Sequence, residues 1–275
     1  MSAIEILPLT PVIGAEVRGV DLSRPLVPGM VHALEQALLD HMVIFFRDQD
    51  ITPEQQIAFA RHFGEISIPP FAPKYGTRPE LIVLDQQSPK GEGADEWHSD
   101  NTFMAEPPMG SILRAVELPP LGGDTCFASM YAAYEALSAP IRRLIDDLGA
   151  VHDLTKPLQK GIAAGHTTVD LAEMQRSWPP VVHPVVRTHP KTGRRALFVN
   201  GNSTTQILGL SPRENAALLP FLIDHVRSPE FQCRFRWERN SVAFWDNRST
   251  QHFAVPDYAE RRVMHRVTVG GDKPF

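Results

Sequence analysis

The sequence contains little cysteine and no long apolar run. Cys126 and Cys233 are its only cysteines, which excludes a disulfide-rich scaffold, and we expect both to be reduced, packed thiols. The longest apolar runs, such as residues 42–46, are far shorter than the roughly 20 residues that span a bilayer. The opening residues, MSAIEILPLT, show neither the basic n-region nor the apolar core of a signal peptide. We therefore expect a soluble, cytoplasmic protein with no membrane partner.

Positive charge is not in excess either. The 27 Lys and Arg residues are outnumbered by 32 Asp and Glu residues, the net charge is -5, and no basic stripe stands out. A nucleic-acid partner is not expected, because it would require a concentrated basic surface. Small molecules are the expected partners. Histidine, in contrast, is plentiful, and 11 histidines mildly indicate a metal site.

The chain has the size and composition of one domain. Its 275 residues, 43% of them hydrophobic, can bury a sizeable core, and no repeat, low-complexity tract or polar linker divides them. We therefore predict a single domain over residues 1–275. The 25 prolines interrupt the chain often and favour many short elements.

The apolar pattern predicts a mainly β fold with helical insertions. An extended stretch is expected over 12–22, helices over 28–41 and 52–63, and a buried strand over 42–46. From residue 81 onward, short strands are separated by Gly and Pro turns, as in a jelly roll or barrel; they are expected at 81–85, 110–118, 124–128, 181–188, 196–200, 231–237, 241–245 and 262–269. Helical patterns interrupt them at 130–148 and 212–227. The segment 154–180 shows no clear strand and is interpreted either as a lid or as a plain connection.

His98 and Asp100 are the first candidates for metal ligands. On an extended backbone they share one face, because side chains alternate with period two, so both can bind the same metal. Taken alone, such a short motif is a weak signal. His252, presented by a turn after a buried strand, would complete two imidazoles and one carboxylate, unless it is merely a surface histidine. That triad leaves three positions free and suits a non-haem Fe(II) centre.

Two arginines lie close together in a later predicted strand. Arg262 and Arg266 would share one strand face about 13 Å apart, at roughly 3.3 Å per residue. A guanidinium group binds a carboxylate as a two-pronged fork, so each arginine could bind a different anion. An exposed edge strand with solvated arginines is the alternative.

Several longer motifs occur in a characteristic order: residues 97–100 (WHSD), 122–125 (GGDT), 183–190 (HPVVRTHP), 196–200 (ALFVN), 245–252 (WDNRSTQH), 261–268 (RRVMHRVT) and 271–274 (GDKP). In these motifs the chain resembles the TauD/TfdA family of Fe(II)- and 2-oxoglutarate-dependent dioxygenases over nearly its whole length. The resemblance implies a double-stranded β-helix, or jelly roll. It also implies that the reaction consumes 2-oxoglutarate and O₂, hydroxylates a small anionic substrate, and yields succinate and CO₂. Homodimers or tetramers are common in the family.

The resemblance also assigns roles to single residues. It places iron on His98, Asp100 and His252, the distal carboxylate of 2-oxoglutarate on Thr125 and Arg262, and the primary substrate on Arg266, Asn101 and Phe103. In contrast, His152, His183 and His189 are interpreted as hydrogen-bonded structural groups.

Departures from the taurine enzymes argue against taurine itself as the preferred substrate. Where those enzymes have pocket side chains, alignment places Pro69, Ala72, Ala94, Leu158 and Ser203. A proline can donate no hydrogen bond to a sulfonate. We therefore expect a larger sulfonate, a sulfate ester or an aryloxyalkanoate, with a taurine dioxygenase as the alternative.

Two other classes of protein remain to be weighed. A zinc or manganese jelly-roll hydrolase or isomerase would use the same three ligands, but it would leave Arg262 and Thr125 unexplained. A non-catalytic jelly roll would use the histidines only for packing. Succinate formation from 2-oxoglutarate identifies the dioxygenase, and a lack of Fe(II) uptake identifies the non-catalytic protein.

Overall fold

The computed structural model describes residues 4–68, 78–87, 94–163, 165 and 168–275. In this part of the chain, strands form sheets of seven, three, three and two members, and helices cover them, so the fold is mainly β with helices, as predicted. Both cysteines are free thiols, also as predicted. Among the described residues, no helix has the length and apolar character that crossing a membrane requires.

The largest sheet is built from both ends of the chain. Its order is β1 (Glu5–Pro8), β2 (Ala15–Arg18), β3 (Val43–Phe46), β13 (Val242–Asp246), β5 (Gly110–Glu117), β15 (Arg262–Val269) and β4 (Ile82–Gln86). Neighbouring strands are antiparallel except for the parallel pair β2 and β3. The apolar run of β3 and β13 follows from their central position, because both faces of the sheet are covered.

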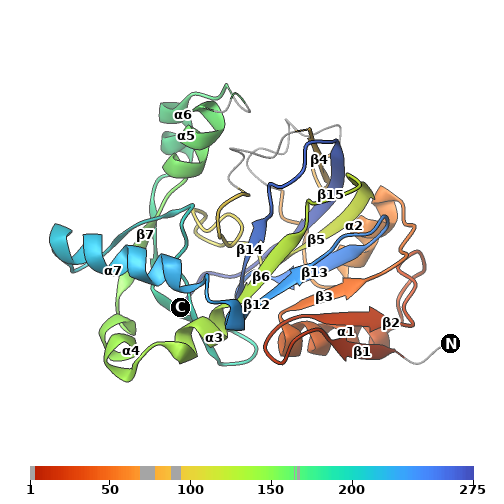
Figure 1. Ribbon diagram of the computed structural model, residues 1–275, viewed down its shortest axis with the longest axis horizontal. Coiled ribbons are helices and arrows are strands. Elements are labelled where there is room, and N and C mark those ends of the chain that lie inside the picture. The colour runs from red at the N-terminus through yellow and green to blue at the C-terminus, as the bar shows by residue number, and fades with distance from the viewer. Residues whose placement is uncertain (1–3, 69–77, 88–93, 164, 166–167) are drawn as a thin grey trace.

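A three-stranded sheet lies beside one face of the large sheet. It consists of β12 (Gln232–Phe235), β6 (Thr125–Ser129) and β14 (Thr250–Ala254), with β6 in the middle (Figure 1). The main core lies between the two sheets. There the Phe45 ring stacks on Phe235, with centroids 3.9 Å apart, and meets the edge of Phe127 at 5.6 Å.

Two helices cover the other face of the large sheet, α1 (Pro28–His41) and α2 (Pro53–Arg61). Because strand side chains alternate, Phe46 faces this second core while Phe45 faces the first. The rings of Phe46 and Phe244 lie 5.9 and 6.1 Å from Phe59 of α2. Thr52 caps the start of α2 and forms a capping box with Gln55, and Pro53 is the first residue of the helix.

Between β6 and β12 the chain makes a long excursion. It contains α3 (Met130–Ala136), α4 (Ala139–Ile145), β7 (Gly149–His152), α5 (Thr155–Ala163), α6 (Leu171–Ser177), β8 (Val181–Pro184), β9 (Val186–Thr188), β10 (Arg195–Leu197), β11 (Thr204–Ile207), α7 (Pro212–His225) and the short 3-10 helix η2 (Pro229–Phe231). β11, β7 and β8 form one small sheet, and β10 and β9 form another. Figure 1 shows α5 and α6 standing away from the large sheet.

Two predictions about this excursion were wrong, and four of its elements were not predicted. The helix expected over 130–148 is two helices, because the chain leaves helical geometry at Leu137 and Pro140 starts a new helix. The strand expected over 181–188 is two strands in different sheets. Neither the helices of segment 154–180 nor the strands β7 and β11 were predicted, since their apolar periods are short.

Candidate metal centre and co-substrate site

Backbone pairing brings the two candidate histidines together. His98 forms an isolated bridge with His252 of β14: the His98 N–H donates to the His252 carbonyl at 3.1 Å, and the His252 N–H donates to the His98 carbonyl at 2.8 Å. Residues directly opposite each other on antiparallel strands have neighbouring side chains. The two imidazole centroids are accordingly 4.2 Å apart.

Asp100 completes the cluster from the large-sheet side. Its Oδ1 lies 3.8 Å from His98 Nε2 and 3.9 Å from His252 Nε2, and one ligand atom from each residue lies within 4.8 Å of the others. The three residues are only 9%, 5% and 7% exposed in chain order. The structure thus brings together the three residues that the sequence singled out, and a surface turn is excluded for His252.

The protonation states suit a divalent metal. Burial lowers the pKa of both histidines, that of His252 to about 3, which leaves the imidazoles neutral at pH 7. Burial alone would raise the pKa of Asp100, but the charge of Arg266, followed by the two histidines, outweighs it and brings the pKa to about 2. Neutral imidazoles and an ionised carboxylate are the forms that bind a metal ion.

Further contacts orient these ligands. His98 Nδ1 lies 2.7 Å from the Glu96 carbonyl, which fixes the tautomer that leaves Nε2 free to bind metal. Ser111 Oγ on β5 donates to Asp100 Oδ2 at 2.9 Å, and Arg266 Nη1 donates to Oδ1 at 3.2 Å. Sequence reasoning identified neither Glu96 nor Ser111, because no motif marks them.

Thr125 and Arg262 meet around a third residue, Trp237. Trp237 Nε1 donates to Thr125 Oγ1 at 3.0 Å, and the Arg262 guanidinium carbon lies 6.0 Å from the Trp237 ring centroid. The same carbon lies 5.8 Å from the Tyr258 ring centroid. Glycine is required at Gly123 because φ is +72° and a Cβ would lie 3.2 Å from the Arg262 side chain.

Arg262 is a buried cation that forms no direct ion pair with a carboxylate in the described part of the chain, although Tyr258 hydrogen-bonds its side chain and the charge of Asp124 acts on it from farther away. It is 4% exposed, and its Nε atom has no hydrogen-bond partner among the described residues. Burial lowers the pKa of Arg262, but a guanidinium group keeps its proton under these conditions. A buried charge of this kind is costly unless an anion compensates it. The geometry therefore fits the carboxylate of a ligand.

The predicted substrate residues either contact Asp100 or follow it closely in the chain. Arg266 contacts Asp100, while its Nε has no partner among the described residues. Asn101 adopts φ +50°, which turns the chain sharply after the metal ligand. Phe103 packs into a separate apolar cluster with Leu154 and Leu158 of the excursion.

The positions that depart from taurine enzymes are partly described. Leu158 belongs to the Phe103 cluster. Ser203 is buried and its N–H donates to the Asn200 side chain, and the Ala94 carbonyl accepts from the end of β14. Pro69 and Ala72 lie outside the described residues.

The three histidines that were interpreted as structural are buried and hydrogen-bonded, as predicted. His152 Nδ1 lies 3.0 Å from Thr102 Oγ1, His183 Nε2 lies 3.0 Å from the Thr102 carbonyl, and His189 Nε2 lies 3.0 Å from Asp246 Oδ2. Each is buried and hydrogen-bonded.

Comparisons with known proteins agree with this geometry. The sequence model of the taurine catabolism dioxygenase TauD, TfdA family matches residues 5–268. An alpha-ketoglutarate-dependent sulfate ester dioxygenase of Pseudomonas putida is 40% identical over 280 residues, covering 98% of this chain and 91% of the relative. An alpha-ketoglutarate-dependent 2,4-dichlorophenoxyacetate dioxygenase of Cupriavidus pinatubonensis is 34% identical, covering 96% of this chain and 97% of the relative.

A solved structure is similar over the whole chain. The crystal structure of AAD-2 in complex with Mn(II) and N-oxalylglycine superposes with a TM-score of 0.85 at 34% identity, covering 99% of each chain. N-oxalylglycine has the skeleton of 2-oxoglutarate with an N–H in place of one methylene group.

Proposed function

The chain belongs to the TauD, TfdA family of dioxygenases, and from this premise we propose that it uses Fe(II), 2-oxoglutarate and O₂ to hydroxylate a small anionic substrate next to a heteroatom. The proposal rests on one observation: His98, Asp100 and His252 lie close together in a buried cluster. When bound, a ferrous ion held by two histidines and one carboxylate supplies the activation of O₂ that this oxidation requires.

Each of the two arginines would bind a different anion. Arg262, with Thr125 beside it, would hold the distal carboxylate of 2-oxoglutarate, since it is the buried cation without a carboxylate partner among the described residues. Arg266 would bind the anionic group of the substrate through its unpartnered edge, while Asp100 keeps its other edge in place. This division also favours the dioxygenase over a zinc or manganese hydrolase, which has no use for Arg262.

Among substrates, a sulfate ester is the class we propose first. One relative is named for a sulfate ester and the other for 2,4-dichlorophenoxyacetate, and the former shares 40% of its aligned residues with this chain. Phe103, three residues after Asp100, belongs to an apolar cluster that would face the carbon chain of the substrate. Hydroxylation of the carbon that bears the sulfate gives an unstable adduct, which collapses to an aldehyde and releases sulfate.

We further propose that the two sheets around the main core form a jelly roll, as the family resemblance implies, and that residues 1–275 form one domain. The core shared by β3, β6, β12 and β13 supports this architecture. We also retain the expected cytoplasmic location and a homodimer or homotetramer, which light scattering would test.

The test is anaerobic reconstitution with Fe(II), followed by addition of O₂, 2-oxoglutarate and one of four substrates. Hexyl sulfate, hexylsulfonate, phenoxyacetate and taurine would be compared by succinate formed. We expect a higher kcat/KM for hexyl sulfate than for taurine. No succinate with any of them would reject the dioxygenase, and a preference for taurine would reject the substrate class. Sulfate release by zinc-loaded protein without 2-oxoglutarate would support the hydrolase.

A further inference from the structure

The side-chain amide of Asn247 hydrogen-bonds both the N–H and the carbonyl group of Asp100. Its Oδ1 accepts from the Asp100 N–H at 2.7 Å, and its Nδ2 donates to the Asp100 carbonyl at 3.0 Å and to the Pro108 carbonyl at 3.1 Å. All of these groups are buried, and Asn247 is 147 residues away from Asp100 in the sequence. An amide is the side chain that can both accept and donate here, because a carboxylate has no donor.

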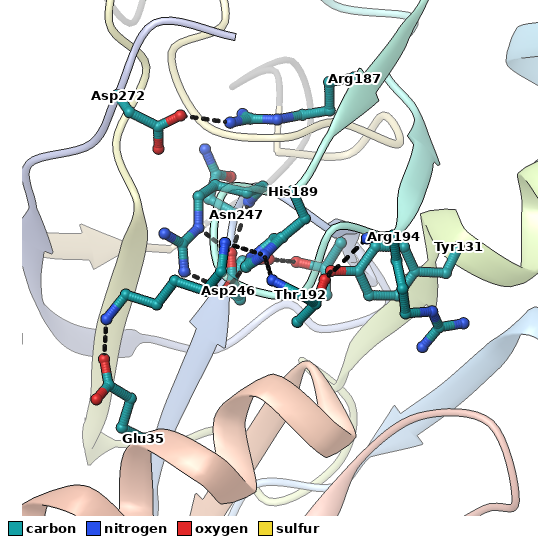
Figure 2. Close-up of polar contacts among 12 residues, drawn as sticks. Glu35, Tyr131, Arg187, His189, Thr192, Arg194, Asp246, Asn247 and Asp272 are labelled. Carbon is teal, nitrogen blue, oxygen red and sulfur yellow. Dashed lines mark hydrogen bonds and ion pairs between the residues drawn. The ribbon is translucent and has the colours of Figure 1, made fainter. Parts of the chain in front are cut away.

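The turn that carries Asn247 is itself held by a buried ionic network (Figure 2). Asp246 Oδ1 accepts from the Arg248 N–H and Nε, each at 2.9 Å, and Oδ2 accepts from Arg248 Nη2 at 2.6 Å. His189 Nε2 adds a fourth hydrogen bond at 3.0 Å. The backbone N–H groups of Lys191 and Thr192 both approach His189 Nδ1 at 3.2 Å, so Nε2 is the nitrogen that donates to Asp246.

This turn joins β13 to β14 and therefore affects two of the three ligands. His252 lies on β14, five residues after Asn247, and Thr250 Oγ1 donates to the Asp246 carbonyl at 2.8 Å between them. Asp100 is attached to the same turn through the Asn247 side chain, and the adjacent Ser99 is attached through its Oγ, which donates to the Thr250 carbonyl at 2.7 Å. The Asn247 amide is therefore one of the contacts that set the distance between the Asp100 carboxylate and the His252 imidazole.

We propose that Asn247 is a positioning residue that sets the place of Asp100 in the metal site. The inference rests on the proposed metal centre at His98, Asp100 and His252. Groups that orient metal ligands typically contribute a 10- to 100-fold effect on metal affinity. We therefore expect Asn247→Ala to weaken Mn(II) binding by about that factor. Asn247→Asp keeps the size and the acceptor but loses both donated hydrogen bonds, and it should weaken binding as well.

Asn215 provides a matched control. Its Oδ1 accepts from the Ile207 N–H and its Nδ2 donates to the Ile207 carbonyl, both at 2.8 Å, and Nδ2 also reaches the Leu210 carbonyl at 3.5 Å. Asn215, in the first turn of α7, thus hydrogen-bonds both backbone groups of Ile207 at the end of β11, a residue that binds no metal. Asn215→Ala and Asn215→Asp should lower the melting temperature without changing Mn(II) affinity.

The experiment measures Mn(II) affinity by the electron paramagnetic resonance signal of free Mn(II), without oxygen or turnover, together with the melting temperature of each apo variant. The expected result is weaker Mn(II) binding and a changed bound-metal spectrum for both Asn247 variants, and parent-like affinity for both Asn215 variants. Mn(II) affinity within twofold of the parent in a folded Asn247 variant would overturn the proposal. So would failure of both Asn247 variants to fold with excess Mn(II), since Asn247 would then be needed for folding itself. Lack of Mn(II) binding by the parent would instead reject the metal centre.

Discussion

Replacing Arg262 with Gln tests whether a buried cation without a carboxylate partner is reserved for 2-oxoglutarate. The side chain is 4% exposed and its Nε has no partner among the described residues, so a bound carboxylate would receive a charge-assisted fork in a site from which water is largely excluded. Gln retains a neutral hydrogen bond at most. We put the loss at about 2 to 4 kcal/mol, which corresponds to a roughly 30- to 900-fold increase in the apparent Kd for 2-oxoglutarate.

Arg261 gives the matched control, because it is the preceding arginine on the same chain segment. It is exposed and ion-paired with Asp85 at 2.7 Å and Glu117 at 3.1 Å. Arg261→Gln should leave the 2-oxoglutarate dependence unchanged, since exposed ion pairs contribute little. Titration of 2-oxoglutarate into Mn(II)-loaded protein by calorimetry, with succinate formation as a second assay, separates the two variants.

The stability of the apo protein provides a second test of the role of Arg262. A structural arginine would destabilise the apo protein when removed, whereas removing a buried cation that lacks an anionic partner should leave the melting temperature of the apo protein unchanged or raised. An unchanged 2-oxoglutarate Kd in Arg262→Gln, or a large loss of apo stability, would refute the assignment.

The remaining predictions concern the metal, the substrate and acid stability. Asp100→Ala or His252→Ala should abolish substrate oxidation while circular dichroism stays native; full activity in either iron-loaded variant, without added ligands, would contradict the metal site. Arg266→Gln should raise KM for an anionic substrate more than tenfold and leave the 2-oxoglutarate Kd within a few-fold, and equal effects on both would refute the division of roles. Burial lowers the pKa of His152 to about 3, so its neutral form stabilises the fold above an unfolded-state pKa of about 6.5, and this stability falls as pH drops toward 3. Urea unfolding between pH 4.5 and 5.5, where an unfolded histidine is almost fully protonated, should therefore show a pH slope that is smaller by about 1.4 kcal/mol per pH unit in a folded His152→Gln variant, and an unchanged slope would contradict this.

The parts of the fold that could be predicted from the sequence are those specified locally. The helix over Pro28–His41 has the predicted bounds, because an apolar stripe, an initial proline and the change to the apolar run of β3 all act within a few residues. The alternation of side chains along an extended backbone likewise predicted that His98 and Asp100 lie beside the same metal position. Strand β15 has its predicted bounds for the same local reason.

What could not be predicted depends on contacts between distant segments. The hydrogen bond from Ser111 to Asp100 depends on how β5 is paired, and the hydrogen bonds between Asn247 and Asp100 join residues 147 positions apart. Serine and asparagine are common at such positions for many reasons, so their residue types alone carry no signal. The short helices α5 and α6 are stabilised by packing around Phe103, which their own sequences do not reveal.

The most direct test of the account is the fate of oxygen in a reaction under ¹⁸O₂ with Fe(II)-loaded protein, 2-oxoglutarate and hexyl sulfate. The account predicts succinate and sulfate in equal amounts, one ¹⁸O atom in each succinate molecule, and neither product with Asp100→Ala. Release of sulfate without succinate, or succinate without ¹⁸O, would contradict it.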